Sequence, residues 1–414
     1  MVLSAVVIFT LTYITISVQR LPYFRLDRTS GALVGAVAMI AFGVLGLTEA
    51  YQAINPDTII LLLGMMIIVA YLQTSGFFDI VSSFILKHAR TDSQLLFTVI
   101  IVSGTLSAFF VNDTVCVMLT PFILTLTSRY RTDPKPYLLA LASSANIGSV
   151  ATLVGNPQNM LVGTFSRWGY IPFFFMMLPI AAIGLIIDFY TIKFFFRKKL
   201  NRTLSGEVFR SESRRPDKPL VYKSLAAVLI VIIGLSAGAN LAFMSILGAS
   251  ILILIANKRP DEIFARVNWS LLLFFASLFV VVAGINKAGI VANVQDFLKP
   301  YFTISTEEQI VGFSFVSLVL SNIVSNVPYV MIVRHWVASF NLPHLMWLVL
   351  AMSATFAGNL TVVGSVANMI VLELSKIRAP FKFWEFTKVS GAIALLSWIA
   401  GTLIFIVYAK LGVR

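Results

Sequence analysis

The chain has 414 residues, of which 58% are hydrophobic and 12% are charged, and its mean hydropathy is +0.90. A soluble core of this size could not bury so much apolar surface, so the composition excludes an ordinary soluble protein and predicts a polytopic membrane protein. The net charge is +13, but the basic residues form no stacking surface and no soluble basic domain, which argues against nucleic-acid binding.

Apolar runs of spanning or near-spanning length follow one another along the chain. They fall at about 2–18, 31–48, 58–76, 138–165, 170–195, 223–238, 242–257, 269–286, 344–374 and 389–409. The first run lacks a basic start and a small-residue cleavage site, so we expect a retained helix and not a signal peptide. The polar, basic stretch 197–222 predicts a cytoplasmic linker between residues 1–196 and 223–414.

Two further runs, at about 94–128 and 309–340, each break at a polar centre. If each run enters and leaves by the same face, most of the 31 lysines and arginines fall on one side, which is then cytoplasmic. We therefore expect two re-entrant hairpins, about ten full spans, an outside N-terminus and a location in the cell (inner) membrane.

The two halves of the chain resemble each other at an offset of about 213 residues. LSAFFVN from Leu106 matches LSNIVSN from Leu320, and TLVGNPQNM from Thr152 matches TVVGSVANM from Thr361. The expected topology places the halves in opposite orientations. The sequence thus predicts an all-α protein of two inverted repeats, each with a hairpin and a discontinuous helix (about 138–165 and 344–374). This is an architecture of secondary transporters, whose site lies at the repeat interface.

Each half contributes two polar breaks at membrane depth, where backbone is tolerated only if protein or water satisfies it. Their neutral amides, hydroxyls and helix ends suit a polyhydroxylated solute, an oxyanion or a sodium ion. Helix capping is the alternative for any one of these asparagines. The predicted substrate-binding residues are Asn112, Thr114, Gly155, Asn156, Asn159, Ser325, Asn326, Gly364, Ser365 and Asn368.

Acidic side chains inside the apolar runs are few. A carboxylate deep in a membrane costs at least about 2.5–3.5 kcal/mol and normally binds a cation or proton, so Asp113 is predicted to carry a coupling proton. The alternative for Asp113 is capping of the following half-helix. We expect Asp188 to pair with Lys193 or to reach the interface, and Arg334 with His335 to lie near the outer surface.

Enzyme and cofactor patterns are missing from the sequence. It has no Walker loop, zinc-ligand spacing or nucleophile elbow, and only three histidines. Its single cysteine, Cys116, cannot form an internal disulfide. We therefore expect no enzymatic activity, no cofactor and no bound metal.

The tips and breaks resemble those of the ion transporter superfamily over nearly the whole chain. The segment FFVNDTVCVMLTP is similar to the FxNDxxxxxLTP segment of ArsB-type arsenite permeases, which are related to NhaD-type antiporters and divalent anion/sodium symporters. Asp113 replaces the central asparagine of the symporter tip, and Val327-Pro328 removes the threonine of the second tip. These departures disfavour a di- or tricarboxylate substrate.

The resemblance implies export of arsenite or antimonite as neutral trihydroxides in exchange for protons, with the hairpins and broken helices moving against a scaffold. Silicic acid shares this hydroxyl chemistry. One thiol at Cys116 cannot build a three-sulfur arsenic site. Three alternatives stay open: a sodium/proton antiporter, a sodium-coupled anion symporter, and a membrane subunit driven by a cytoplasmic ATPase. A homodimer is an analogy from the superfamily.

Overall fold

The computed structural model describes all residues except 19–26, 204–215, 299–304 and 413–414, so much of the predicted linker lies outside the described residues. Within the described ranges, the regular structure consists of α-helices and short 3-10 turns, with one isolated bridge between Thr91 and Thr203. The prediction of an all-α polytopic protein is confirmed.

Seven helices of the described chain are long and apolar enough to cross a membrane. They are α4 (Pro56–Thr74), α6 (Asp92–Phe109), α10 (Tyr170–Phe195), α11 (Lys218–Ser236), α14 (Trp269–Lys287), α16 (Thr306–Val324) and α20 (Phe383–Lys410). Shorter apolar helices accompany them, among them α1 (Val2–Val18), α2 (Arg28–Ala41) and α12 (Leu241–Ile255). Two of the spans begin with an asparagine cap at equivalent positions of the repeat. The side-chain oxygen of Asn55 caps α4, and that of Asn268 caps α14.

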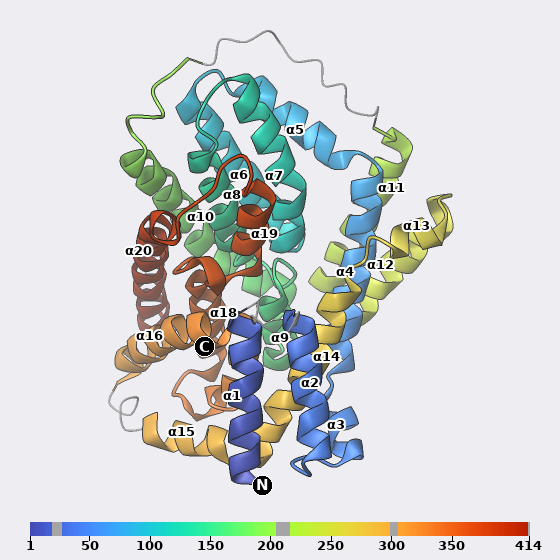
Figure 1. Cartoon of the computed structure of the whole chain (residues 1–414), viewed down its shortest axis with the longest axis vertical. Helices are drawn as coiled ribbons and strands as arrows, with labels where there is room; N and C mark the ends of the chain where they lie inside the picture. The colour runs from blue at the N-terminus through green and yellow to red at the C-terminus, as the bar shows by residue number, and fades with distance from the viewer. Residues whose placement is uncertain (19–26, 204–215, 299–304, 413–414) are drawn as a thin grey trace.

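The first hairpin consists of α6 and α7 (Asn112–Arg129). Asp92, at the start of α6, accepts hydrogen bonds from Thr132, just beyond the end of α7, at 3.1 Å, and from Tyr137, in the first turn of the next helix, at 2.8 Å. The two arms therefore begin and end at the same side of the molecule, as predicted for a re-entrant segment. The short helix α5 (Phe77–His88) lies at this end (Figure 1).

The second hairpin consists of α16 and α17 (Asn326–Val333), followed by a 3-10 turn at Val337–Ser339. Asn341 donates its backbone N–H to Gln309 near the start of α16, at 3.0 Å. This hairpin opens toward the opposite end, where α3 (Leu47–Ala53) and α15 (Ile290–Leu298) lie (Figure 1). The two hairpins enter from opposite ends, which is the arrangement of inverted repeats. The predicted range of about 309–340 covers α16, α17 and the 3-10 turn, and the polar pair Arg334-His335 follows the end of α17.

Two helices are broken in the middle of the molecule. The first comprises α8 (Lys135–Ser149) and α9 (Pro157–Ser166). The second comprises α18 (Pro343–Ala357), the 3-10 turn Val362–Gly364 and α19 (Val366–Ser375). Almost every residue of α8 and α18 is buried, so the breaks lie in the core. Both predicted discontinuous helices are thus present.

Helix contacts repeat between the two halves with their partners exchanged. Helix α2 packs on α14 while α4 packs on α12, and α7 packs on α19 while α17 packs on α9. Figure 1 shows α2, α3, α4 and α11–α14 gathered on one side, and α6–α8, α10, α16 and α18–α20 on the other. The short helix α13 (Pro260–Phe264) follows α12. We call the first group, together with α1, the scaffold group, and the second group, with α5, α9, α15 and α17, the hairpin group.

Candidate functional site

The tip of the first hairpin is joined to the first helix break. Asn112 opens α7, and its backbone N–H donates to the carbonyl oxygen of Gly155 at 3.1 Å. Its side-chain amide donates to Asn146 Oδ1 of α8 at 2.8 Å. Asn112 is 4% exposed, so both hydrogen bonds lie in the protein interior. The tip is therefore fixed to α8 and to the break that follows it.

The first break is closed by two predicted asparagines. Asn156 caps α9 by accepting the N–H of Asn159 at 2.8 Å, and it donates to Ser149 Oγ at 2.7 Å. Asn159 Nδ2 donates to the carbonyl oxygens of Ser149 and Thr152 at 3.2 and 2.9 Å. These carbonyls lie at and beyond the end of α8 and lack helical partners. Gly155 is required here, because a Cβ would collide with the Ser149 carbonyl oxygen.

The second break repeats this chemistry. Asn368 Nδ2 donates to the carbonyl oxygens of Gly358 and Thr361 at 2.7 and 3.1 Å, the counterparts of the acceptors used by Asn159. Ser365 caps α19 by accepting the N–H of Ala367 at 3.2 Å. A Cβ at Gly364 would collide with the side-chain amide of Asn322. Capping and satisfaction of the break are thus part of the role of these residues.

Asn146 lies at the centre of the site and was not among the predicted residues. Its Nδ2 donates to Asn359 Oδ1 at 2.7 Å and to Asn368 Oδ1 at 3.2 Å. Its Oδ1 accepts from Asn112 Nδ2 at 2.8 Å and from Ser365 Oγ at 2.9 Å. All four hydrogen-bonding positions of one amide are therefore used, and they join the first hairpin tip to both halves of the second break.

The second hairpin tip is held by its own side chains. Ser325 has a φ of +79°, and Asn326 Oδ1 accepts from Ser321 Oγ at 3.0 Å. Asn322 Nδ2 donates to the Ala357 carbonyl oxygen at 2.8 Å, which ties the tip to the end of α18. Thr355 of α18 accepts from Asn156 Nδ2 at 3.4 Å, so the first break also contacts the second half.

Asp113 and Thr114 form the first turn of α7 beside Asn112, and both are half-buried. The Asp113 carboxylate interacts electrostatically with the guanidinium of Arg28, at the start of α2. Arg28 Nη2 also contacts Met369 Sδ of α19 at 2.7 Å. Arg28 is half-buried and therefore places a guanidinium beside the first tip.

Some buried oxygen atoms at the tip and break have no hydrogen-bonding partner among the described residues. They are Asn112 Oδ1, Asn159 Oδ1 and Ser107 Oγ. An unpaired buried polar atom costs about 1–3 kcal/mol, so these atoms are available to a solute or to water. Each can accept a hydrogen bond from a hydroxyl group.

The network consists of neutral amides and hydroxyls. The charged groups, Asp113 and Arg28, lie beside it. Asn112, Asn156, Asn159, Ser365 and Asn368 join through Asn146 and the helix ends, whereas Asn326 lies at the second tip. Thr114 and Ser325 line their tips without a described side-chain hydrogen bond. No group of three metal-ligating side chains occurs in the described part of the chain. The arrangement is suited to a neutral hydrogen-bonding solute beside one carboxylate.

The predicted substrate-binding set did not include Asn146, Asn359, Thr355, Asn322 or Arg28, although Asn359 lies in one of the predicted polar breaks. Asn146 had a visible signal, since it is an amide within the otherwise apolar and small-residue stretch LALASSANIGS. Arg28 had none, because a basic residue at a helix start has the same pattern whether it faces solvent or the interior.

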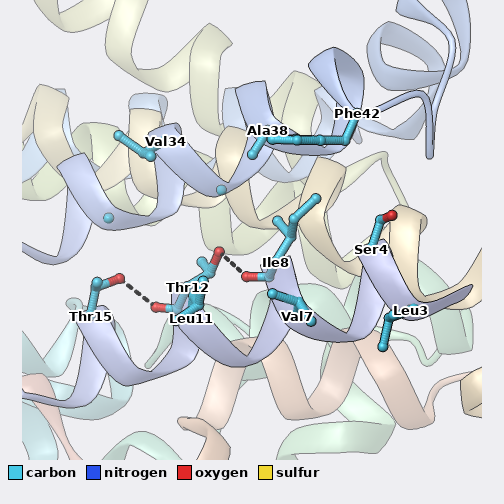
Figure 2. A pocket seen from close by; sticks show the side chains of 12 residues that line it. Leu3, Ser4, Val7, Ile8, Leu11, Thr12, Thr15, Val34, Ala38 and Phe42 are labelled. Atoms are coloured by element: carbon cyan, nitrogen blue, oxygen red, sulfur yellow. Dashed lines mark hydrogen bonds between the residues drawn. The ribbon is translucent and has the colours of Figure 1, made fainter. Parts of the chain in front are cut away.

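Other cavities differ chemically from this network. A cavity of about 430 Å³ lies between α1 and α2 and is lined mainly by apolar side chains, among them Leu3, Ile8 and Val34 (Figure 2). The hydroxyls of Thr12 and Thr15 donate to carbonyls of their own helix (Figure 2), so they offer no free donor to a solute. This cavity does not suit a polar solute.

A polar cavity of about 410 Å³ lies at the end of the molecule that carries α3. Its lining includes Glu49, Lys287, Arg334 and His335, and Lys287 forms a 2.6 Å ion pair with Glu49. The hydrogen bond from Lys287 holds the pKa of Glu49 below its usual value. Arg334 lies over the ring of Phe165, 4.4 Å from its centroid. Arg334 and His335 follow α17, and this cavity lies outside the network around Asn146.

Comparison with known proteins places the fold and the family. The model of the family described as CitMHS, citrate transporter, matches residues 11–342. The silicon efflux transporter LSI3 of Oryza sativa subsp. japonica is 30% identical, with 86% of each chain covered. A protein of Dictyostelium discoideum named after arsB is 26% identical, with 94% of this chain and 89% of that protein covered.

A solved structure agrees with the fold. The YdaH transporter of Alcanivorax borkumensis, described as having an unusual topology, superposes with a TM-score of 0.60 at 11% identity. The match covers 100% of this chain and 98% of that one. The identity is low, so this likeness concerns the arrangement of helices alone.

Proposed function

Because the chain belongs to the citrate transporter family (CitMHS), within the ion transporter superfamily, we propose that it exports arsenite and antimonite in exchange for protons. Both solutes are neutral trihydroxides near neutral pH. The observation that carries the proposal is the buried cluster of amides and hydroxyls around Asn146, with acceptor oxygens left unpaired on Asn112 and Asn159. Hydroxyl groups of the solute would donate to these oxygens.

The charge at the site argues against the substrate that the family description prints. Citrate carries several negative charges, and a buried anion requires cations or an array of donors. The Asp113 carboxylate would repel citrate at the first tip. The nearby guanidinium of Arg28 already interacts with Asp113. A neutral solute avoids this repulsion.

Asp113 is the residue that we propose for proton coupling. It lies one residue from Asn112, so a proton on its carboxylate and a solute on the amide cluster would influence each other directly. Exchange of a neutral solute for one proton moves one charge, for which 100 mV supplies about 2.3 kcal/mol. At about 1.4 kcal/mol per tenfold, this supports a gradient of roughly 50-fold without ATP.

Silicic acid is the second candidate solute. A relative that is 30% identical over most of both chains is named a silicon efflux transporter. Silicic acid is also a neutral polyhydroxide, so it would use the same acceptors. Sodium/proton exchange, sodium-coupled anion transport and dependence on a separate ATPase are the competing functions.

The proposed movement carries the hairpin group against the scaffold group. The chain would divide into repeats at 1–196 and 223–414, with the linker on the cytoplasmic face of the cell (inner) membrane. The reciprocal packing of α2 on α14 and of α4 on α12 supports this division.

The proposal is tested by a panel of solutes added to sealed proteoliposomes that contain the protein and a pH-sensitive dye in the lumen. Arsenite, antimonite or silicic acid added outside should move protons out of the lumen and raise its pH. Citrate should not do so, and sodium should be unnecessary. A response to sodium alone would favour the antiporter, and a response to citrate only with sodium would favour the symporter. No response to any solute would contradict an autonomous carrier.

A further inference from the structure

Asp188 is a second acidic side chain in the interior, and the proposed function does not use it. It lies on α10, is 0% exposed, and faces α8. The expectation that it pairs with Lys193 or reaches the interface is wrong, because its described partner is Ser143 Oγ at 2.7 Å. Lys193 instead lies 5.4 Å from the centroid of the Phe189 ring.

The two short contacts of the Ser143 hydroxyl are both satisfied if the Asp188 carboxyl group carries a proton. The Ser143 hydroxyl has one hydrogen, yet its oxygen lies 2.8 Å from the Leu139 carbonyl oxygen and 2.7 Å from Asp188 Oδ1. Both contacts are satisfied when Ser143 donates to Leu139 and a protonated Asp188 donates to Ser143. The other carboxyl oxygen, Oδ2, has no partner among the described residues, which a neutral acid tolerates far better than an anion.

No described cation neutralises Asp188. Helix α10 packs against α6, α8, α11, α18 and α20. Lys218 and Lys410 are exposed at the ends of α11 and α20, and other charged groups of these helices have described contacts elsewhere. Lys135 pairs with Glu385 at 2.8 Å, Lys388 lies over Phe195, and Lys223 donates to the Ile255 carbonyl oxygen. Asp92 of α6 accepts from Tyr137, and His344 of α18 packs on Trp168. A charged carboxylate would therefore be isolated.

The fold does not need an acid at this place. At the repeat offset of about 213, the counterpart of Asp188 is Gly401 on α20, which packs against Met352 of α18. The same helix contact is thus built in the second half from a glycine and an apolar side chain. The acid of the first half is an addition to the packing and not a requirement of it.

Ser143 links Asp188 to the network around Asn146. The Ser143 carbonyl oxygen accepts from Asn359 Nδ2 at 3.2 Å, and Asn359 Oδ1 accepts from Asn146 Nδ2 at 2.7 Å. Ser143 and Asn146 are also one turn apart on α8. Displacement of Ser143 by loss of the proton would therefore move two residues of the candidate site.

We propose that Asp188 is a second proton-binding site, occupied by a proton at the interface of α8 and α10 and connected through Ser143 and Asn359 to the solute network. The proton is released as the carboxyl group becomes a carboxylate, which requires water to enter this interface. Occupancy of the site by a proton rests on the hydrogen bonds above, whereas its part in coupling rests on the proposed function.

The proton is tested by infrared difference spectroscopy of the purified protein, which detects the C=O stretch of a protonated carboxylic acid. At neutral pH the wild-type band should lose intensity in Asp188→Asn and keep it in Asp261→Asn, a matched control at an exposed carboxylate paired with Arg259. A band that is unchanged in Asp188→Asn, or that appears only when sodium is removed, would overturn the proposal.

Ser143→Ala provides a second test that does not depend on the folding of Asp188→Asn. Loss of the hydroxyl should shift the frequency of the same band, because the acid loses its acceptor. An unshifted band would contradict the assigned contact. Neither result requires arsenite transport, so failure of the solute assignment is distinguishable from failure of the proton site.

The coupling role has its own readout in weakly buffered solution. Addition of a transported solute should change proton binding by wild-type protein, and Asp188→Asn should lose at least half of that change while still binding the solute. An unaltered proton change in a folded Asp188→Asn protein would overturn the coupling role.

Discussion

At the residue scale, Asp113 and Asn146 have different roles in the candidate site. Asp113 carries a carboxylate, whereas Asn146 holds neutral side chains together through hydrogen bonds. Asp113 borders the amide cluster without a hydrogen bond to it in the described structure, so its protonation can change while the cluster keeps its geometry. Asn146 instead touches four side chains from three segments of the chain. Their substitutions should therefore fail in different ways.

Asp113→Asn should separate solute exchange from proton coupling. The amide keeps the size of the side chain and removes the titrating group, so exchange of labelled for unlabelled arsenite should continue. Net uptake driven by a pH gradient should fall at least tenfold, because the proton has lost its carrier. Asp261→Asn, at an exposed site, is the control. Gradient-driven uptake at the wild-type rate would eliminate Asp113 as the coupling residue.

Asn146→Ala should destabilise the protein and abolish transport. The substitution removes the hydrogen bonds that Asn146 makes to buried side-chain atoms of Asn112, Asn359 and Ser365. The free energy of unfolding should fall by about 3 kcal/mol. Thermal unfolding in detergent measures it. Thr125→Ala is the control, because this hydroxyl is exposed and bonds its own helix, and it should change stability by less than about 0.5 kcal/mol. Equal stability of the two variants would refute the central role of Asn146.

The candidate residues could be predicted where their side chains break an apolar pattern. Asn112, Asn156, Asn159 and Asn368 stand out in this way, and all four lie at the tips or breaks. What the sequence did not reveal is which atom each side chain contacts. The amides of Asn159 and Asn368 satisfy backbone carbonyls, so helix-end chemistry accounts for part of the pattern that suggested binding.

At the element scale, the broken helices depend on glycines that admit close approach of backbone. The ideal Cβ of Gly148 would collide with the Gly104 backbone, and that of Gly155 with the Ser149 carbonyl oxygen. These contacts bring α8 against α6 and close the break over the first tip. The sequence predicted a polar break here, but not this contact.

Gly155→Ala should therefore destabilise the first break. An extra methyl group in a packed position costs about 1–3 kcal/mol, and the displaced Ser149 carbonyl also accepts from Asn159. Thermal unfolding and arsenite binding should both weaken. The control is Gly46→Ala, where a Cβ meets Glu49 Oε2 at an ordinary 3.4 Å. A Gly155→Ala protein that unfolds and binds like the control would show that the break tolerates the methyl group.

The long helices were predictable because an apolar run of spanning length has few other solutions. Helices α4 and α14 follow the predicted runs and share a capping asparagine at matching positions. The short helices α3, α5, α13 and α15 were not predicted. They mix polar and apolar residues over at most 12 positions, so they leave no signal in a search for apolar runs.

At the scale of the whole molecule, the two groups of helices meet where α9 packs on the scaffold helix α4 and approaches the start of α12. The ideal Cβ of Gly163 on α9 would lie 2.9 Å from Leu241 Cδ1 on α12. A movement of the hairpin group must change this contact, whereas contacts within the scaffold group should persist. Pairs of engineered cysteines can distinguish the two.

In a Cys116→Ala background, cross-linking of Gly163→Cys with Leu241→Cys should stop gradient-driven uptake, and a reductant should restore it. The matched pair Gly234→Cys and Met244→Cys lies within the scaffold group, where the glycine Cβ position is close to the methionine side chain. Cross-linking this second pair should leave uptake intact. Full activity of the first pair when cross-linked would contradict movement between the two groups.

The central claim is that the protein alone exchanges a neutral hydroxylated solute for protons. The most direct measurement is arsenite uptake into proteoliposomes that contain only this protein, with the lumen more acidic than the medium, in the presence and absence of sodium. The account predicts uptake that follows the proton gradient, is independent of sodium and needs no ATP. If the folded protein moves no arsenite under the proton gradient, with or without sodium, the account is contradicted.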